Sequence, residues 1–220
     1  SWDENRVVID VLITVKGASS RRVQEKLDEI DVYFSLQPDH VIAKTQIEEN
    51  WSLKFFKSAR IQYRIDYTIK LPRSSKVDLT NDYGSIALNA LDGSAKIHCD
   101  FGKLLIGALN SENNILNFDY TNNSSFDFIR GGKIQADFSS FDVEEAEAIE
   151  LEADYTTSEF KTLQELDFKN DFGKLIIGQI NSLRGKGDYL TLKIETLFHD
   201  TELDNEFGLI RINQVMPTTK

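Results

Sequence analysis

The chain of 220 residues is poor in cysteine and proline. Its single cysteine, Cys99, cannot form an intrachain disulfide, so cysteine content does not identify the redox compartment. The three prolines, Pro38, Pro72 and Pro217, would interrupt few strands. No apolar stretch approaches the length that crosses a bilayer, so no transmembrane segment is expected in this chain.

Basic residues are also scarce relative to acidic ones. There are 25 Lys and Arg against 36 Asp and Glu, which gives a formal net charge of −11. This balance argues against a nucleic-acid partner, because phosphates need a basic surface, and it disfavours anionic membranes for the same reason. Acidity most often serves solubility; the alternative is an acidic face that holds cations. The 14 Phe and 7 Tyr exclude a disordered chain.

An acid followed by an aromatic residue recurs along the last two thirds of the chain. Successive aromatics are 18, 19, 18, 17, 17, 17 and 18 residues apart. The eight dipeptides are Asp82-Tyr83, Asp100-Phe101, Asp119-Tyr120, Asp137-Phe138, Asp154-Tyr155, Asp171-Phe172, Asp188-Tyr189 and Glu206-Phe207. Such regular spacing indicates a solenoid in which each repeat is one coil.

Apolar residues alternate with polar ones on both sides of each aromatic. With the aromatic as position zero, they recur six and four residues before it and three, five and eight after it, as around Phe172. A period of two indicates strands. Counting back by twos places the aromatic on the core face and the preceding acid in water. The sequence therefore predicts an inward aromatic ladder of Tyr83, Phe101, Tyr120, Phe138, Tyr155, Phe172, Tyr189 and Phe207.

Other repeat positions support coils with short turns. The residue two before the aromatic is mostly small or Asn, and the residue after it is mostly Gly, Ser or Thr, with Leu190 as an exception. Polar turn segments such as Asp92-Gly93, Asn181-Ser182 and Gly131-Gly132 are expected to join the two strands of a coil. After Tyr120 the apolar pattern comes one residue late, which predicts a bulge or small loop at 122–125.

The predicted fold is therefore all-β. Residues 72–220 are expected to form a right-handed parallel β-helix of about eight coils of 17 to 18 residues. Residues 1–71 are expected to form an N-terminal cap, continuous with the solenoid. Within that cap the sequence predicts strands at 7–15, 32–36, 40–47 and 61–71, and a short helix carrying Val23, Leu27 and Ile30. A cap is needed because an open coil exposes strand edges.

The unit Asn-x-Tyr/Phe-Gly-x-Ile/Leu-x-Ile/Leu occurs at 81–88, 170–177 and 205–212. With Leu71-Pro72 and Trp2-Asp3, it makes the chain resemble the adhesin-head family of bacterial β-helix domains, many of which have no known function. The resemblance implies export in a Gram-negative bacterium, with a periplasmic or cell-surface location and a leader upstream of Ser1. It supplies no catalytic or binding residues.

The acidic row from Asp82 to Glu206 has three possible roles. Its carboxylates can bond turn N–H groups and block sideways association, which is the favoured interpretation. The alternatives are binding of Ca²⁺ and catalysis by a carboxylate pair. His98-Cys99 resembles half a metal site, but alternation puts the two side chains on opposite faces and no second cysteine exists. No metal and no cofactor are expected.

An aromatic run, Trp51, Phe55 and Phe56, falls in a predicted loop at 48–60. It is a candidate recognition surface for a glycan or protein, although a plug for the end of the stack is favoured. The sequence thus predicts a non-enzymatic exported module, an adhesin or scaffold that binds a glycan or protein. The alternative is a polysaccharide-active β-helix enzyme, a lyase or glycosidase, which would need a groove with convergent unlike charged groups.

Overall fold

The computed structural model describes residues 2, 4–48 and 61–216. They form two compact units that divide between Pro72 and Arg73. The sequence placed this boundary one residue earlier. That the N-terminal unit covers the end of the coil stack stays a prediction.

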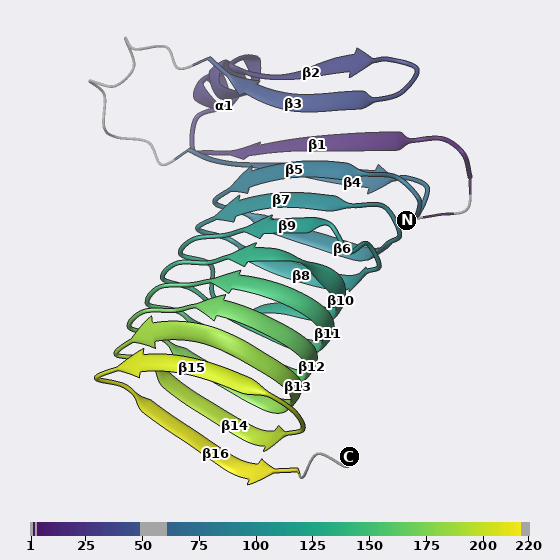
Figure 1. Ribbon diagram of the computed structural model, residues 1–220. Coiled ribbons are helices and arrows are strands. Elements are labelled where there is room, and N and C mark those ends of the chain that lie inside the picture. The colour runs from purple at the N-terminus through teal and green to yellow at the C-terminus, as the bar shows by residue number, and fades with distance from the viewer. Residues whose placement is uncertain (1, 3, 49–60, 217–220) are drawn as a thin grey trace. The chain divides into compact units, whose positions relative to one another are not determined.

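The described residues of the N-terminal unit form two antiparallel strand pairs and one helix (Figure 1). Strand β1 (Val8–Lys16) pairs with β4 (Gln62–Lys70), and β2 (Ile30–Leu36) pairs with β3 (Val41–Ile47). Helix α1 (Ser20–Asp28) precedes β2. The predicted strands and helix are confirmed, with one correction: Ile30 is not helical but begins β2, where it is buried.

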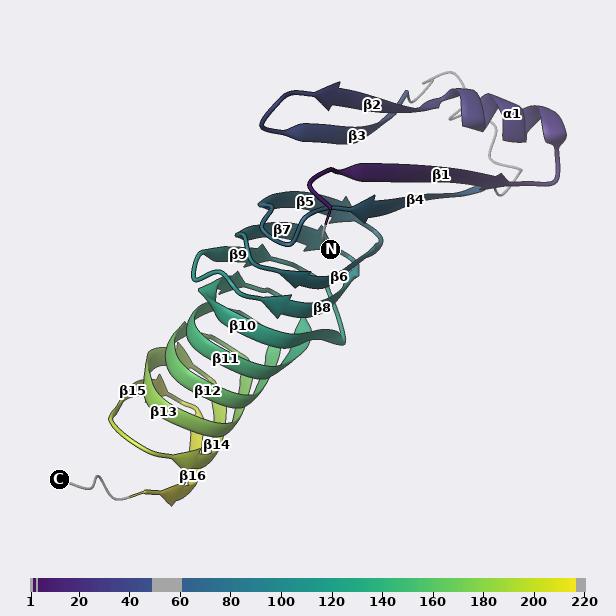
Figure 2. The same ribbon diagram turned by 90° about the vertical axis from the view of Figure 1, so that its right-hand side faces the viewer.

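The second unit is a parallel β-solenoid, as the repeat predicted (Figures 1 and 2). Equivalent residues of successive coils lie side by side in register, for example Phe160 beside Ile177. Its handedness stays a prediction from the crossover rule. The strands are β5 (Val77–Asp82), β6 (Ser85–Leu91), β7 (Ala95–Asp100), β8 (Lys103–Leu109), β9 (Asn114–Asn117), β10 (Ser124–Gln135), β11 (Ser140–Glu152), β12 (Thr157–Lys169), β13 (Lys174–Asp188), β14 (Thr191–Leu197), β15 (Thr201–Glu206) and β16 (Leu209–Val215).

Each coil has two strand segments whose alternate side chains meet in the core. In one coil the inward residues are Leu166 and Phe168 before the corner and Leu175 and Ile177 after it, and each is between 0% and 4% exposed. One coil could not bury these side chains, but stacking gives every apolar residue a neighbour above and below. The hydrophobic effect of this stack, of about 25 cal/mol per Å² buried, is what stabilises the solenoid.

The eight repeat aromatics lie outside this core, so the predicted inward ladder is wrong. Their exposed fractions run from 46% for Phe138 to 80% for Tyr83. All eight have positive φ, between 51° and 61°. A residue in this left-handed conformation ends the alternation of the strand, so the aromatic and the acid before it both point outward. The residue after the aromatic then points inward, as the buried Thr156 and Leu190 show.

Two inward positions therefore flank each aromatic corner, two residues before it and one after it, and at two corners a side chain at one position is matched by glycine at the other. Where Leu190 fills the second position, Gly187 occupies the first, and a Cβ on Gly187 would lie 3.3 Å from the Leu190 Cβ. Where Asn170 fills the first position, Gly173 occupies the second, and a Cβ there would overlap the Asn170 side chain. Leu190 departs from the Gly, Ser or Thr of the repeat. It fits because the paired inward position is Gly187, which has no side chain.

Three central coils place a hydroxyl at the inward position after the corner. Thr121, Ser139 and Thr156 are buried, and each hydroxyl donates to main-chain carbonyls of its own coil or the preceding one. The Ser139 and Thr156 hydroxyls also accept from the backbone N–H of Thr121 and Ser139, at 3.0 Å. These bonds satisfy polar groups that would otherwise be costly to bury.

At the corner opposite the aromatics, the predicted polar turns are present at Asp92-Gly93 but absent from the coils in the middle of the stack. Asp92-Gly93 lies outside the strands as expected, but Asn181-Ser182 lies within β13 and Gly131-Gly132 within β10. Strands β10 to β13 run through this corner without a turn. Gly132 has φ 136°, a conformation that a side chain would strain. The predicted irregularity after Tyr120 is confirmed, because Asn123 adds a second positive-φ residue to that coil.

Candidate functional site

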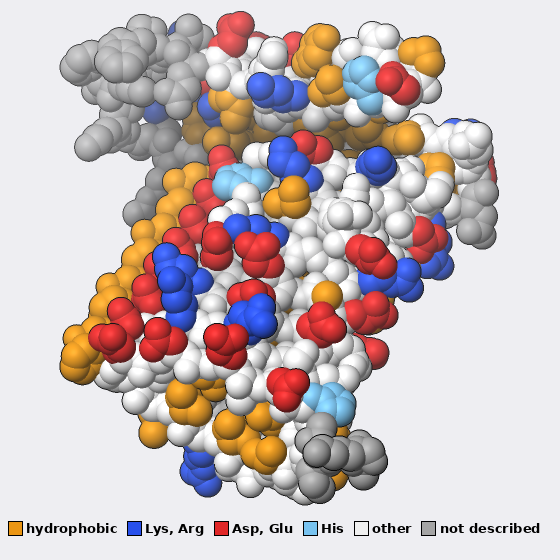
Figure 3. Space-filling model, viewed as in Figure 1, with side chains coloured by type: hydrophobic (Ala, Val, Ile, Leu, Met, Phe, Trp, Pro, Cys, Tyr) orange, Lys and Arg blue, Asp and Glu red, His pale blue; other side chains and the backbone are white. Residues whose placement is uncertain are grey.

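The exposed aromatics form one continuous stack along an edge of the solenoid. Seven successive ring pairs are stacked, with centroids 4.9 to 5.4 Å apart and interplanar angles of 2° to 18°. We call this stack, Tyr83, Phe101, Tyr120, Phe138, Tyr155, Phe172, Tyr189 and Phe207, the aromatic edge. It is the orange column that runs along one side of the solenoid in Figure 3. With seven such intervals the column is about 35 Å long.

Each inner ring of the aromatic edge has both faces covered by its neighbours. Solvent therefore meets the ring edges, which carry C–H bonds with partial positive charge and, in Tyr120, Tyr155 and Tyr189, a hydroxyl group. Stacking contributes about 0.5 to 1.5 kcal/mol per pair and so offsets the cost of holding a bulky residue at positive φ, about 1 to 2 kcal/mol. A sugar that stacks on an aromatic ring needs a free face, and the inner rings do not offer one.

The acidic row lies beside the aromatic edge and makes backbone hydrogen bonds. Five carboxylates, those of Asp100, Asp119, Asp137, Asp154 and Asp171, accept from the N–H of the acid one coil further on, at 2.8 to 3.2 Å. The favoured interpretation, that these acids bond corner N–H groups, is confirmed for these coils. Each such bond contributes about 1 kcal/mol.

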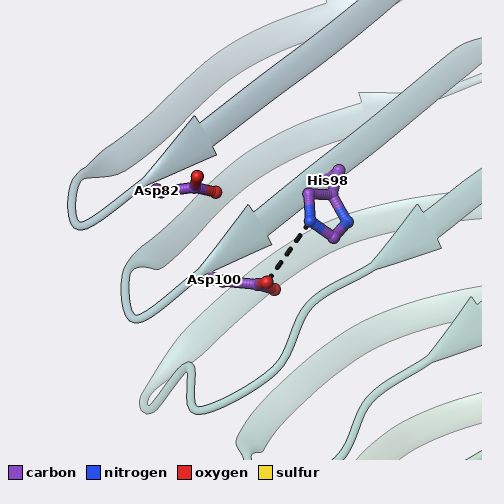
Figure 4. A group of neighbouring side chains, drawn as sticks. All are labelled: Asp82, His98 and Asp100. Carbon is purple, nitrogen blue, oxygen red and sulfur yellow. Dashed lines mark ion pairs between the residues drawn. The ribbon is translucent and has the colours of Figure 1, made fainter.

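The first coil departs from this pattern, and there the acids meet a histidine. Strands β5 and β7 stay paired through Asp82 and Asp100, and in the described part of the chain no bond joins the Asp82 carboxylate to the Asp100 N–H. His98, two residues before Asp100 on the same strand face, holds its Nε2 3.3 Å from the Asp100 carboxylate (Figure 4). One ligand atom from each of Asp82, His98 and Asp100 lies within 4.8 Å of the others.

Cys99 takes no part in this cluster. It is fully buried in the core, whereas His98 points outward, so the prediction that the two face opposite ways is confirmed. Burial raises the pKa of the Cys99 thiol, and the thiol is therefore less available as a thiolate ligand. The sequence pattern pairs His98 only with its neighbour Cys99, and the acids 16 residues before and two after it, Asp82 and Asp100, were not predicted as its partners. Their shared outward face was the available signal.

The outer faces of the coils carry charged side chains around two hollows. The first, of about 480 Å³, lies over strands β11 to β14 and β16, with Ile176 and Gly178 among its lining residues. Asp142 lies there, and burial, reinforced by nearby Glu144, raises the pKa of its carboxyl. Glu144 is paired with Lys161 at 2.6 Å, and hydrogen bonding to Glu144 raises the pKa of Lys161.

The second hollow, of about 900 Å³, lies near the corner opposite the aromatic edge. Its basic groups are paired: Lys133 contacts Glu150 and Glu152 at 3.1 and 2.9 Å, and Arg184 contacts Glu202 at 3.2 Å. The hydrogen bond from Lys133 lowers the pKa of Glu152. These pairs join one coil to the next, which is a structural role, and each exposed pair contributes at most about 1 kcal/mol.

The predicted recognition residues Trp51, Phe55 and Phe56 lie outside the described residues. Their role as a binding surface or plug stays a prediction. Within residues 2, 4–48 and 61–216, no helix is long and apolar enough to cross a membrane. Comparisons with protein-family models, curated proteins and solved structures gave no match to the chain.

Proposed function

We propose that the chain is a non-enzymatic binding module of the bacterial surface or periplasm, whose solenoid presents the aromatic edge to a protein partner. The observation that carries this proposal is the exposure of eight aromatic side chains in one unbroken column. Soluble proteins rarely leave so long an apolar strip uncovered unless it meets a partner. The location rests on the resemblance to adhesin-head domains alone.

The chemistry beside the aromatic edge favours a basic, apolar partner. The carboxylates of Asp119, Asp137, Asp154 and their equivalents border the rings, and red side chains flank the orange column in Figure 3. Lys or Arg of a partner can approach these carboxylates while apolar side chains cover the ring edges. A protein is favoured over a glycan because stacking hides the faces of the inner rings.

The test compares two immobilised peptides of equal charge, one alternating Lys with Phe and one alternating Lys with Ser. We expect the purified chain to bind the Lys/Phe peptide at least about tenfold more tightly, since it alone covers the rings. The double variant Phe138→Gly/Tyr155→Gly removes two central rings and keeps the corner conformation, because glycine adopts positive φ readily. It should lose most of this preference, as read by surface plasmon resonance.

The matched control changes charge away from the aromatic edge. The variant Glu144→Gln/Glu159→Gln/Glu195→Gln removes three carboxylates of the first hollow and should keep the preference. A preference that survives loss of the rings would contradict the proposal. Tight binding to a glycan array that depends on the same two rings would replace the protein partner with a glycan.

The first hollow supports the second candidate function, a polysaccharide-active enzyme. A carboxyl with a raised pKa, such as that of Asp142, is the kind of group that donates a proton to a leaving sugar oxygen. The same purified chain is therefore incubated with acidic and neutral polysaccharides, and reducing ends and unsaturated products are measured. Turnover lost in Asp142→Asn would establish the enzyme and refute the non-enzymatic module.

A further inference from the structure

We propose that Asp82, His98 and Asp100 bind a divalent transition-metal ion such as Zn²⁺. Imidazole nitrogens and carboxylate oxygens are both ligands of Zn²⁺ in proteins, and three such ligands would leave a fourth position open for water. The three residues come from two neighbouring strands, β5 and β7, whose register places Asp82 directly beside Asp100. This inference is independent of the proposed function.

The distances already approach those of a coordinated ion. Ligand bonds of 2.0 to 2.2 Å in a tetrahedron place two ligand atoms about 3.4 Å apart. His98 Nε2 and the Asp100 carboxylate are 3.3 Å apart, and the Asp82 oxygen lies within 4.8 Å of both. The Asp82 side chain is exposed, so rotation about its side-chain bonds can close the remaining gap without moving the backbone.

The local departure from the acidic row leaves the Asp82 carboxylate free for this role, and Asp100 keeps one oxygen available. In the five coils from Asp100 to Asp171 one oxygen is engaged by a backbone N–H, and Asp100 uses its Oδ1 in this way while its Oδ2 faces His98. Asp82 makes no such bond within the described residues. Lys96, the nearest basic residue along β7, is instead paired with Asp78 at 3.0 Å.

Electrostatics also favour a cation at this point. Asp82 and Asp100 lie side by side on parallel strands, and like charges directly opposite each other destabilise a sheet. Among the ion pairs of the described residues, none joins either carboxylate to Lys or Arg. A divalent ion would neutralise both carboxylates, and the imidazole makes the cluster selective for a transition metal over Ca²⁺.

The test is a titration of the tag-free, chelator-treated chain with ZnCl₂. Binding is measured by calorimetry and by NMR of the histidine side chains. We expect one saturable site, a shift of the His98 imidazole signals, and a loss of affinity of at least tenfold in His98→Gln and in Asp82→Asn. A hundredfold excess of CaCl₂ should leave Zn²⁺ affinity within about threefold of its value.

Matched controls separate this site from general binding to an acidic surface. His199→Gln changes another exposed histidine, and Asp137→Asn changes an acid of the same row whose oxygen is held by the Asp154 N–H. Both should bind Zn²⁺ as the unchanged chain does. The proposal is overturned if no saturable site is seen, if His98→Gln binds normally, if the controls lose as much affinity, or if Ca²⁺ displaces Zn²⁺. All four positions carry outward side chains, and melting curves confirm that each variant is folded.

Discussion

Replacing Ala153 with Asp is expected to destabilise the solenoid more than any substitution on the aromatic edge. Ala153 is 2% exposed at the inward position before the Tyr155 corner. A carboxylate there would be buried among apolar neighbours without a basic partner, at a cost of more than about 4 kcal/mol. A domain of this size is stable by only about 5 to 15 kcal/mol, so a large share of its stability would be lost.

The matched control places the same residue on the aromatic edge. Phe172→Asp should cost only about 1 to 3 kcal/mol, since it removes two stacking contacts from an exposed side chain. Urea denaturation followed by circular dichroism measures both variants. A greater loss in Phe172→Asp than in Ala153→Asp would restore the inward ladder that the alternation of the sequence suggested.

A second large effect is expected from Gly173→Leu. A side chain at Gly173 would overlap Asn170 and approach the Thr156 carbonyl, so we expect a loss of about 1 to 3 kcal/mol from overpacking. Adding Asn170→Gly recreates the arrangement of Gly187 and Leu190 one coil further on. The double variant should recover at least about 1 kcal/mol of this loss.

A double-mutant cycle with Asn170→Gly alone isolates the coupling between the two inward positions. Urea titrations give the free energies of unfolding of the unchanged chain, the two single variants and the double variant. Coupling near zero would show that the sizes of these two residues are independent. The compensation inferred from Gly187 and Leu190 would then be wrong.

The coil fold was predictable because its signal repeats. Eight acid-aromatic corners and a period of two define coils, parallel pairing and most of the core, including Leu175 and Ile177. The aromatics were predicted to point into the core because bulky residues rarely adopt positive φ, and an unbroken strand would have placed them inward. The spacing of the apolar residues nevertheless indicated the outward direction of the aromatics. Inward positions fall four and six residues before the corner but three and five residues after it, as around Phe172, so the alternation has to break at the corner itself.

The candidate metal cluster could not be found by local spacing. Asp82 and His98 are 16 residues apart and become neighbours only through the register of β5 and β7. Predicting it requires knowing which coil positions face outward and whether Asp82 keeps the backbone bond of its equivalents. The same dependence on three-dimensional stacking explains why Asp142 and its hollow were not anticipated.

The most direct test of the central claim, that the aromatic edge lies outside the core at left-handed corners, compares Tyr155→Gly with Tyr155→Ala. Both remove the same two stacking contacts, but only glycine relieves the backbone strain at φ 52°. We expect the free energy of unfolding of the glycine variant to exceed that of the alanine variant by about 1 kcal/mol. In an ordinary strand glycine is the less stable of the two, so a glycine variant that unfolds more easily than the alanine variant would contradict the account.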